Sequence, residues 1–206
     1  MSRCVVVGGA GINNYDRVKK MLREDDYYIF CDSGLRHIEA LGVMPSLIVG
    51  DFDSYEKPDI NVQTIVLPTV KDDTDTVYGV KEGIKRGYDE FLLLGCVGAR
   101  LDHSLGNVYI LMMLYEKGLK GVIVDDYSVM ELVGDEILEI PDSFSYFSLI
   151  AINGAARAVT IENAKYNLTN AEIKPSYQYG VSNEVIKGEN ARVSVKDGIL
   201  LAIKVF

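Results

Sequence analysis

The stretch Leu47-Ile48-Val49-Gly50-Asp51-Phe52-Asp53-Ser54 joins a short apolar run to two carboxylates. The run at residues 47–49 predicts a buried strand, and Asp51 and Asp53 then fall in the loop at its carboxyl end. In an open parallel sheet, ligands bind at this edge. A solvated turn is the alternative, because Asp and Ser favour turns. The rest of the chain decides between these two interpretations.

Further apolar runs in the first half of the chain predict a parallel sheet. Strands are expected at residues 4–7, 28–31, 47–49, 62–66, 91–94 and 122–124. They alternate with helical patterns, and strands that alternate with helices at this pitch pair in parallel through right-handed crossovers.

The helical patterns are recognised by their apolar spacing. A helix after the first strand would carry Val18, Met21 and Leu22 on one face, and another spans residues 35–41. A third opens near Thr74, which is a candidate N-cap. The fourth follows His103, and it is expected to turn inward Leu105, Val108, Met112 and Tyr115.

The pattern changes after about Asp125, where short alternating apolar runs replace the helices and predict antiparallel strands. These runs lie at residues 129–133, 136–140, 147–152, 158–161, 185–186, 191–195 and 199–205. Asp197-Gly198, between the last two runs, predicts a two-residue hairpin. The fold class is therefore α/β: an N-terminal Rossmann-like domain with a parallel sheet, residues 1–125, followed by an antiparallel β-sandwich domain, residues 126–206.

Composition limits the partners. The 206 residues carry a net charge of −9, which argues against nucleic acid or an anionic membrane as the main partner. No apolar run approaches the roughly 20 residues of a membrane span, and the first residues do not resemble a signal peptide. Cys4, Cys31 and Cys96 are far apart, so we expect reduced, buried cysteines in a cytoplasmic protein.

Carboxylates recur after the predicted strands of the first half. In chain order they are Asp32, Asp51, Asp53, Asp72, Asp73, Asp75 and Asp102. The carboxyl ends of parallel strands share one edge, so these acids are expected to gather there. Like charges about 4 Å apart repel by about 4 kcal/mol at an effective dielectric of 20, so the cluster needs cations. Oxygen ligands suit Mg²⁺, which is usually held by one or two carboxylates and substrate phosphates.

Other residues of this edge fit a nucleotide. Gly8-Gly9-Ala10-Gly11 is a glycine turn before a helix, where backbone N–H groups favour an anion. It completes neither the dinucleotide fingerprint nor a P-loop, so a plain tight turn is the alternative. Lys71 and Arg100 are each either a ligand contact or a local counter-charge. Asp102 is a candidate helix N-cap, ligand contact or both, and His103 is given no catalytic role.

Four motifs resemble those of the thiamine pyrophosphokinase family in order and spacing. They are Gly50-Asp51-Phe52-Asp53-Ser54, Lys71-Asp72-Asp73-Thr74-Asp75, Gly98-Ala99-Arg100-Leu101-Asp102-His103 and Gly180-Val181-Ser182-Asn183-Glu184. The resemblance runs over nearly the whole chain. It implies an ATP-binding catalytic domain, a thiamine-binding β domain and a homodimer with its active site near the subunit interface. It implies the reaction of ATP with thiamine to give AMP and thiamine diphosphate, with Mg²⁺.

The resemblance also implies roles for single residues. The resemblance implies that the Mg²⁺ ligands are Asp51, Asp53 and Asp75. Contacts to ATP or to the reacting end of thiamine are expected from Asp32, Arg100 and Asp102, with Lys71 and Gly11 added as neighbouring nucleotide contacts. The thiamine pocket would include Ser182, Asn183 and Tyr179. The proton of the thiamine hydroxyl would go to Asp75 or Asp102, or be lost late.

Two features depart from the family pattern. Ser33 follows Asp32 where the family often has glycine, so a closely approaching backbone has less room there. The chain has no tryptophan to stack on thiamine, which leaves Tyr177 or Tyr179 for that role. The alternative is that both are ordinary exposed tyrosines.

Two other functions stay open. A related pyrophosphokinase would act on another heterocyclic alcohol, such as a pterin or a modified thiazole. A nucleotide or metal sensor would bind Mg·ATP without turnover, and the full set of acids at the sheet edge speaks against it. Glycosyltransferases share an Asp-x-Asp motif, but the β domain and the later motifs do not suggest one.

Overall fold

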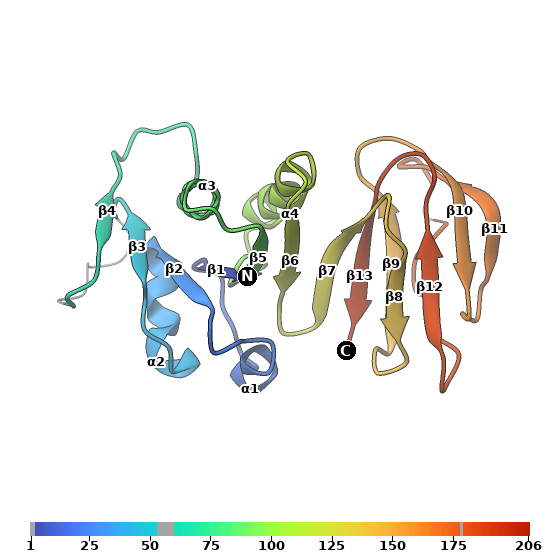
Figure 1. Ribbon diagram of the computed structural model, residues 1–206, viewed down its shortest axis with the longest axis horizontal. Helices are drawn as coiled ribbons and strands as arrows, with labels where there is room; N and C mark the ends of the chain where they lie inside the picture. Colours follow the sequence, from blue (N-terminus) through green and yellow to red (C-terminus); the bar gives the residue numbers. More distant parts are fainter. Residues whose placement is uncertain (1–2, 53–59, 178) are drawn as a thin grey trace. The chain divides into compact units, whose positions relative to one another are not determined.

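The computed structural model describes residues 3–52, 60–177 and 179–206. The chain divides into two compact units, Met1–Asp126 and Tyr127–Phe206 (Figure 1). In these described residues, no helix has both the length and the apolar character needed to cross a membrane.

The first unit is built on a sheet with strand order β4-β3-β2-β1-β5-β6. The strands are β1 (Cys4–Val7), β2 (Tyr27–Cys31), β3 (Leu47–Gly50), β4 (Thr64–Val66), β5 (Glu90–Leu94) and β6 (Lys120–Val124). Each neighbouring pair is parallel. Strands β1 and β3 are buried along their whole length, as expected where both faces of a parallel sheet are covered. The predicted parallel α/β domain is confirmed.

Helices cover both faces of this sheet, α3 and α4 on one and α1 and α2 on the other (Figure 1). Their bounds are α1 (Tyr15–Lys19), α2 (Ile38–Leu41), α3 (Asp75–Lys85) and α4 (Leu101–Tyr115), with a 3₁₀ helix, η1 (Asp32–His37), before α2. Helix α1 is shorter than its apolar pattern suggests, because Met21 and Leu22 lie in the turns that follow it. The helix expected at residues 35–41 begins earlier, as the 3₁₀ turn at Asp32.

The inward face of α4 agrees with the prediction in part. Met112 is buried and Val108 and Tyr115 are half-buried, but Leu105 is 52% exposed. The buried residues of the helix are Ser104, Ile110, Leu111, Met112 and Leu114. The Ser104 hydroxyl accepts a hydrogen bond from Gly98 N at 3.0 Å and lies 3.0 Å from Arg100 O, to which it can donate. This bonding fixes Ser104 inward, in place of the neighbouring Leu105.

The second unit is an antiparallel sandwich. One sheet has the order β7-β13-β9 and the other β11-β10-β12-β8. The strands are β7 (Ser128–Val133), β8 (Leu138–Pro141), β9 (Tyr146–Ala151), β10 (Ala156–Glu162), β11 (Leu168–Ile173), β12 (Asn190–Ser194) and β13 (Leu200–Val205). Both sheets contribute to one apolar core, with Phe147 and Leu200 from the first and Ile161 and Val193 from the second. The predicted antiparallel β domain is confirmed.

Two local predictions in this unit are wrong. Asp197-Gly198 does not close a hairpin, because β12 pairs with β8 and β10 while β13 pairs with β7 and β9. The turn instead carries the chain from one sheet to the other, and Asp197 O accepts from Arg157 N at 2.7 Å. The run at residues 185–186 forms a single bridge to Ala164 and no strand.

Candidate active site

A pocket of about 660 Å³ opens at the carboxyl ends of the parallel strands. The chain order of the sheet reverses between β1 and β5, and such a switch point is where open α/β sheets bind ligands. Gly8 N donates to Leu94 O at 2.8 Å and Ala10 N donates to Gly95 O at 2.9 Å, so the loops after β1 and β5 are joined. Only glycine fits at Gly95, since its φ is +59° and a Cβ would lie 2.3 Å from Gly8 O.

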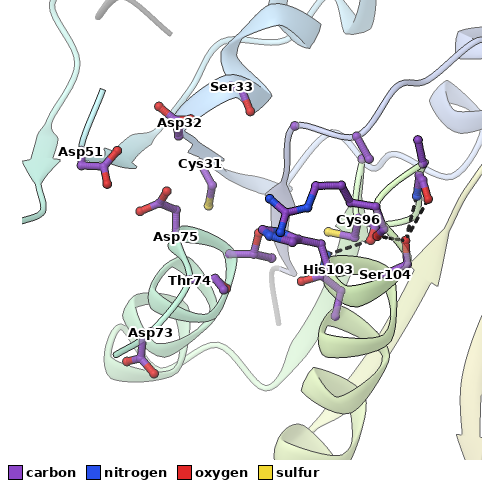
Figure 2. A pocket seen from close by; sticks show the side chains of 18 of the residues that line it. Cys31, Asp32, Ser33, Asp51, Asp73, Thr74, Asp75, Cys96, His103 and Ser104 are labelled. Atoms are coloured by element: carbon purple, nitrogen blue, oxygen red, sulfur yellow. Dashed lines mark hydrogen bonds between the residues drawn. The ribbon is translucent and has the colours of Figure 1, made fainter. Parts of the chain in front are cut away.

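At one side of the pocket, two carboxylates share one ammonium group. Lys71 Nζ lies 2.5 Å from Asp51 Oδ2 and 3.1 Å from Asp75 Oδ1. The side chains of Lys71, Asp51 and Asp75 are 16%, 8% and 21% exposed, so all three are largely shielded from water. Figure 2 shows Asp51 and Asp75 directed toward each other, with Asp32 close by. Burial on its own lowers the pKa of Lys71, but hydrogen bonds to Asp51 and Asp75 outweigh it, and the pKa is raised.

The local structure explains why these acids converge. Asp51 follows the last residue of β3, and Asp75 is the first residue of α3. The Thr74 hydroxyl accepts from Val77 N at 3.3 Å, which confirms Thr74 as the N-cap of α3. Asp73, one residue earlier, bonds Lys81 at 2.6 Å and points away from Asp51 (Figure 2). Of these two acids, Asp75 is therefore the one that faces Asp51.

Asp32 lies at the end of β2 in a left-handed conformation, with φ of +40°. Asp tolerates this region better than most residues, and its side chain is buried. Glycine at position 50 leaves room for it, because a Cβ there would lie 3.1 Å from Asp32 Cα. The next residue, Ser33, fits against Gly9, where a Cβ would lie 1.9 Å from Ser33 Oγ. The side chain that departs from the family pattern is accommodated by a glycine on the neighbouring loop.

The donor set fits a hard divalent cation. Two carboxylates from separate elements already share one cationic group, and Mg²⁺ commonly takes one or two carboxylates with substrate phosphates as further ligands. Within the ranges that the structure describes, no three His, Cys, Asp or Glu side chains form a complete metal-ligand group. Asp53, the other predicted ligand, lies outside the described residues.

The pocket lining also includes one member of an exposed ion pair. Arg100 lines the pocket, and its guanidinium contacts Asp102 at 2.5 and 3.2 Å. The side chains are 70% and 65% exposed. Arg100 occupies the N-cap position of α4 and Asp102 lies in the first turn, so the predicted N-cap role of Asp102 is wrong. The hydrogen bonds from Arg100 lower the pKa of Asp102 to about 2.

The glycine turn lines the pocket through Gly9, Ala10 and Gly11. The backbone amides next along the chain are already used, because Asn13 N and Asn14 N donate to Asp126 Oδ1 at 2.9 and 2.8 Å. The anion at the start of the five-residue helix α1 is therefore a carboxylate of the chain itself. A nucleotide contact at Gly11 would have to use other atoms of the turn.

His37 braces this turn, and no local pattern in the sequence indicates that role. Its Nε2 lies 2.9 Å from Ala10 O and its Nδ1 lies 2.7 Å from the Tyr15 hydroxyl, with the residue 2% exposed. A carbonyl only accepts, so Nε2 carries the proton and Nδ1 accepts from Tyr15. Burial lowers the pKa of His37 despite the bond to Ala10, which favours the neutral ring.

Two of the three predicted free cysteines, Cys31 and Cys96, line the pocket, and all three are buried and reduced. Burial raises the pKa of the Cys96 thiol to about 12 and also raises that of Cys31. A nucleophilic cysteine needs a lowered pKa, so neither thiol suits covalent catalysis.

The predicted thiamine contacts belong to the second unit. The Asn183 amide is buried and engaged at both its nitrogen and its oxygen: Nδ2 donates to Tyr166 O at 2.8 Å, and Oδ1 accepts from Tyr166 N at 3.0 Å and Glu184 N at 2.9 Å. Ser182, at φ of +60°, is exposed. Tyr179 is 48% exposed and stacks on Tyr177, with ring centroids 6.1 Å apart.

Comparison with known proteins covers both units. Residues 18–123 match the thiamin pyrophosphokinase catalytic domain, and residues 136–200 match the thiamin pyrophosphokinase vitamin B1 binding domain. Thiamine pyrophosphokinase of Bacillus subtilis is 25% identical over 207 residues, 97% of this chain and 96% of that protein.

Solved structures agree in fold. The Bacillus subtilis enzyme superposes with a TM-score of 0.86 at 24% identity, covering 100% of this chain and 99% of that one. Thiamin pyrophosphokinase from Geobacillus thermodenitrificans gives 0.82 at 26% identity, covering 100% and 98%. With its sheet-edge acids, its two matched domains and these relatives, the chain belongs to the thiamin pyrophosphokinase family.

Proposed function

We propose that this chain transfers the pyrophosphoryl group of Mg·ATP to the hydroxyl of thiamine, which gives thiamine diphosphate and AMP. Membership of the family supports this activity, and so does the full-length similarity to the thiamine pyrophosphokinase of Bacillus subtilis. The structural observation that carries the proposal is the convergence of Asp51 and Asp75 on one cationic group in the lining of the pocket.

In this proposal, different residues around the pocket bind the metal and the substrates. Asp51 and Asp75 hold Mg²⁺, together with Asp53 on the strength of the family motif. The metal, when bound, offsets the negative charge of the phosphates during the transfer. Asp32 and Gly11 contact the nucleotide or the reacting end of thiamine. This assignment is supported by the position of both residues in the pocket lining.

Arg100 is the side chain best suited to stabilise the negative charge that develops on the phosphate oxygens during the transfer. It is 70% exposed, so it can leave Asp102 and donate to phosphate oxygens at small cost. A guanidinium offers several donors in one plane, which suits a phosphate that gains charge in the transition state. Alignment of the thiamine hydroxyl with the β-phosphorus, with AMP as the leaving group, supplies much of the remaining acceleration.

The proton of the hydroxyl leaves late in this mechanism. Asp102 is a weak base, because Arg100 lowers its pKa to about 2 while the two are paired, and a carboxylate released from such a pair returns only toward the ordinary Asp value of about 4. Asp75 is engaged by Lys71, and a metal at the same carboxylate would weaken its basicity further. Neither carboxylate suits early proton removal, so the hydroxyl attacks before its proton is lost to solvent or to one of these acids.

The second unit binds thiamine in this proposal. Ser182 and Tyr179 are exposed and available for contact, whereas the engaged amide of Asn183 fixes the loop that presents them. A homodimer and a cytoplasmic location complete the proposal. Both rest on the family resemblance, and the buried free cysteines agree with the location.

The direct test is to incubate the protein with Mg·ATP and thiamine and identify both products. We expect AMP and thiamine diphosphate in equal amounts. Formation of ADP alone would overturn the proposal. A pterin alcohol and a thiazole alcohol serve as competing acceptors, scored by AMP release. Preference for either identifies the related pyrophosphokinase, and binding of Mg·ATP with no turnover on any acceptor identifies a sensor.

A further inference from the structure

Lys71 occupies an unusual position for a nucleotide-contacting lysine. Its ammonium lies between two carboxylates that come from different elements, Asp51 after β3 and Asp75 at the start of α3. These are the same two side chains that the proposed function assigns to the metal. The position between Asp51 and Asp75 is therefore filled by a cation belonging to the chain.

The pairing follows from charge. Two largely buried carboxylates facing one another repel, and at an effective dielectric of 20 this costs about 4 kcal/mol at 4 Å separation. One ammonium relieves that repulsion for both Asp51 and Asp75. An ammonium is also a compact charge on a flexible stem, so it can move several ångströms while its backbone stays in place.

We propose that Lys71 is an internal counter-ion that holds the metal site in the absence of metal and moves to the nucleotide phosphates when Mg·ATP binds. This inference rests on the proposed function. The ammonium and a divalent ion compete for the same oxygens of Asp51 and Asp75, and the two cations repel each other. Phosphates bound beside the metal then provide the displaced ammonium with new acceptors.

Competition of this kind lowers the affinity for free metal. If Lys71 occupies the site about 90% of the time, only about one-tenth of the molecules can accept the ion, and the apparent dissociation constant rises about tenfold. Removing the ammonium should therefore tighten metal binding in the absence of nucleotide. The same change should weaken nucleotide binding, because the phosphates lose a donor. A residue with only a structural role would not move the two affinities in opposite directions.

The test is a titration with Mn²⁺, followed by electron paramagnetic resonance, without nucleotide. We expect Lys71→Met to bind Mn²⁺ about tenfold more tightly than the unsubstituted protein. Lys81→Met is the matched control, because Lys81 also bonds an acid of the same motif, Asp73, at 2.6 Å. Its Mn²⁺ affinity should be unchanged. Equal or weaker Mn²⁺ binding by Lys71→Met would overturn the proposal.

Two further measurements make the result independent of one variant. Affinity for Mg·ADP should fall in Lys71→Met, and an unchanged or increased affinity contradicts the transfer of Lys71 to phosphate. In the unsubstituted protein, the side-chain NMR signal of Lys71, assigned with Lys71→Arg, should shift when Mg²⁺ is added alone. A signal that stays constant while metal binds also contradicts displacement.

Asp51→Asn separates this inference from the proposed function. If Asp51→Asn loses Mn²⁺ binding but Lys71→Met does not bind Mn²⁺ more tightly, the counter-ion role of Lys71 is wrong, and the assignment of Asp51 as a metal ligand still stands. Unchanged Mn²⁺ binding in Asp51→Asn shows instead that the metal site of the proposed function is wrong.

Discussion

The two edges of the parallel sheet both carry shielded acidic and basic side chains, but in different proportions. At the amino edge, Arg3 precedes β1 and Asp26 precedes β2, and they form a two-pronged pair at 3.0 and 2.8 Å. Their side chains are 7% and 0% exposed. Met21 O accepts from Arg3, and Arg23 N donates to Asp26. One positive and one negative group balance.

At the carboxyl edge the proportions are unequal among the residues that the structure describes. There the ammonium of Lys71 contacts both Asp51 and Asp75, and Asp32 lies at the same edge (Figure 2). The difference suggests how a structural ion pair can be told from a ligand site. Balanced charges with saturated hydrogen bonds belong to the fold, whereas a local excess of carboxylates indicates a site for a further cation.

Asp51→Asn should produce the largest effect and acts on function. We expect AMP formation with thiamine to fall about a thousandfold, by comparison with loss of other charge-stabilising groups. The fold should be retained, because Lys71 still contacts Asp75. Asp73→Asn is the control, and its activity should stay within a few fold. Similar losses in both variants would mean that the inward position of Asp51 carries no special role.

Asp26→Asn tests the balanced edge and should act on stability. Breaking a buried pair at one partner costs about 3–5 kcal/mol, and urea unfolding would measure the loss. Replacing both partners, Arg3→Met with Asp26→Leu, should recover most of it because no buried charge is left alone. If the double variant is less stable than Asp26→Asn, the pair is not simply a balanced structural one.

Arg100→Ala should lower activity about a hundredfold, as removal of one transition-state donor commonly does. The thermal midpoint should not change, because an exposed pair such as Arg100–Asp102 contributes little to folding. Parallel measurement of AMP formation and thermal unfolding checks both statements. A clear drop in the midpoint would mean that this pair resembles the buried one at the amino edge.

Gly9→Ala should cost about 1–3 kcal/mol of stability, as overpacking does, since the new Cβ would lie 1.9 Å from Ser33 Oγ and 2.9 Å from Ser33 Cβ. Ser33→Gly alone should be tolerated, and Ser33→Gly combined with Gly9→Ala should recover most of the loss. Urea midpoints of the three variants measure the coupling. Simple addition of the two single effects would disprove the contact.

His37 should give the smallest effect, through pH. Its pKa is lowered in the folded protein from 6.5, mainly by burial, so below that pH the unfolded chain binds the proton more readily. The contribution of His37 to the free energy of unfolding is therefore fully present above pH 6.5. It is lost as the pH decreases, by at most about 1.4 kcal/mol per pH unit. His37→Gln should flatten the fall in thermal midpoint between about pH 7.5 and 5.5. An equal slope in this variant and in the unsubstituted protein would contradict the buried, neutral His37.

Much of the fold follows from the sequence because its strongest signals are physical and local. Continuous apolar runs such as that of β3 specify strands buried on both faces. Parallel pairing then brings the strand ends together, which is why the meeting of Asp51 and Asp75 could be predicted from residues 24 positions apart.

Other features depend on contacts that local patterns do not encode. A turn such as Asp197-Gly198 suits a hairpin and a crossing between sheets equally well. Which of the two forms depends on the strands with which β12 and β13 pair. Strand β11 (Leu168–Ile173) has no apolar pattern to predict it, because it is polar and mostly exposed or half-buried. The burial of Ser104 in place of Leu105 depends on the hydrogen bonds of one hydroxyl.

The site shows the same division. Sequence reasoning identifies Lys71 and Arg100 as the positive groups near the acids, and the structure gives them different surroundings. Lys71 is shielded from water between two carboxylates, whereas Arg100 is exposed and pairs with the carboxylate of Asp102. The bracing of Ala10 by His37 joins residues 27 positions apart with no shared pattern, so it could be found only from the fold.

The central claim is that acids at the carboxyl edge bind a triphosphate through a divalent cation. Calorimetric titration of a non-hydrolysable ATP analogue, with and without Mg²⁺, into the unsubstituted protein and Asp51→Asn tests it most directly. We expect tight binding only with Mg²⁺ in the unsubstituted protein, and loss of that Mg²⁺ dependence in Asp51→Asn. An equal Mg²⁺ dependence in the two proteins would contradict the account.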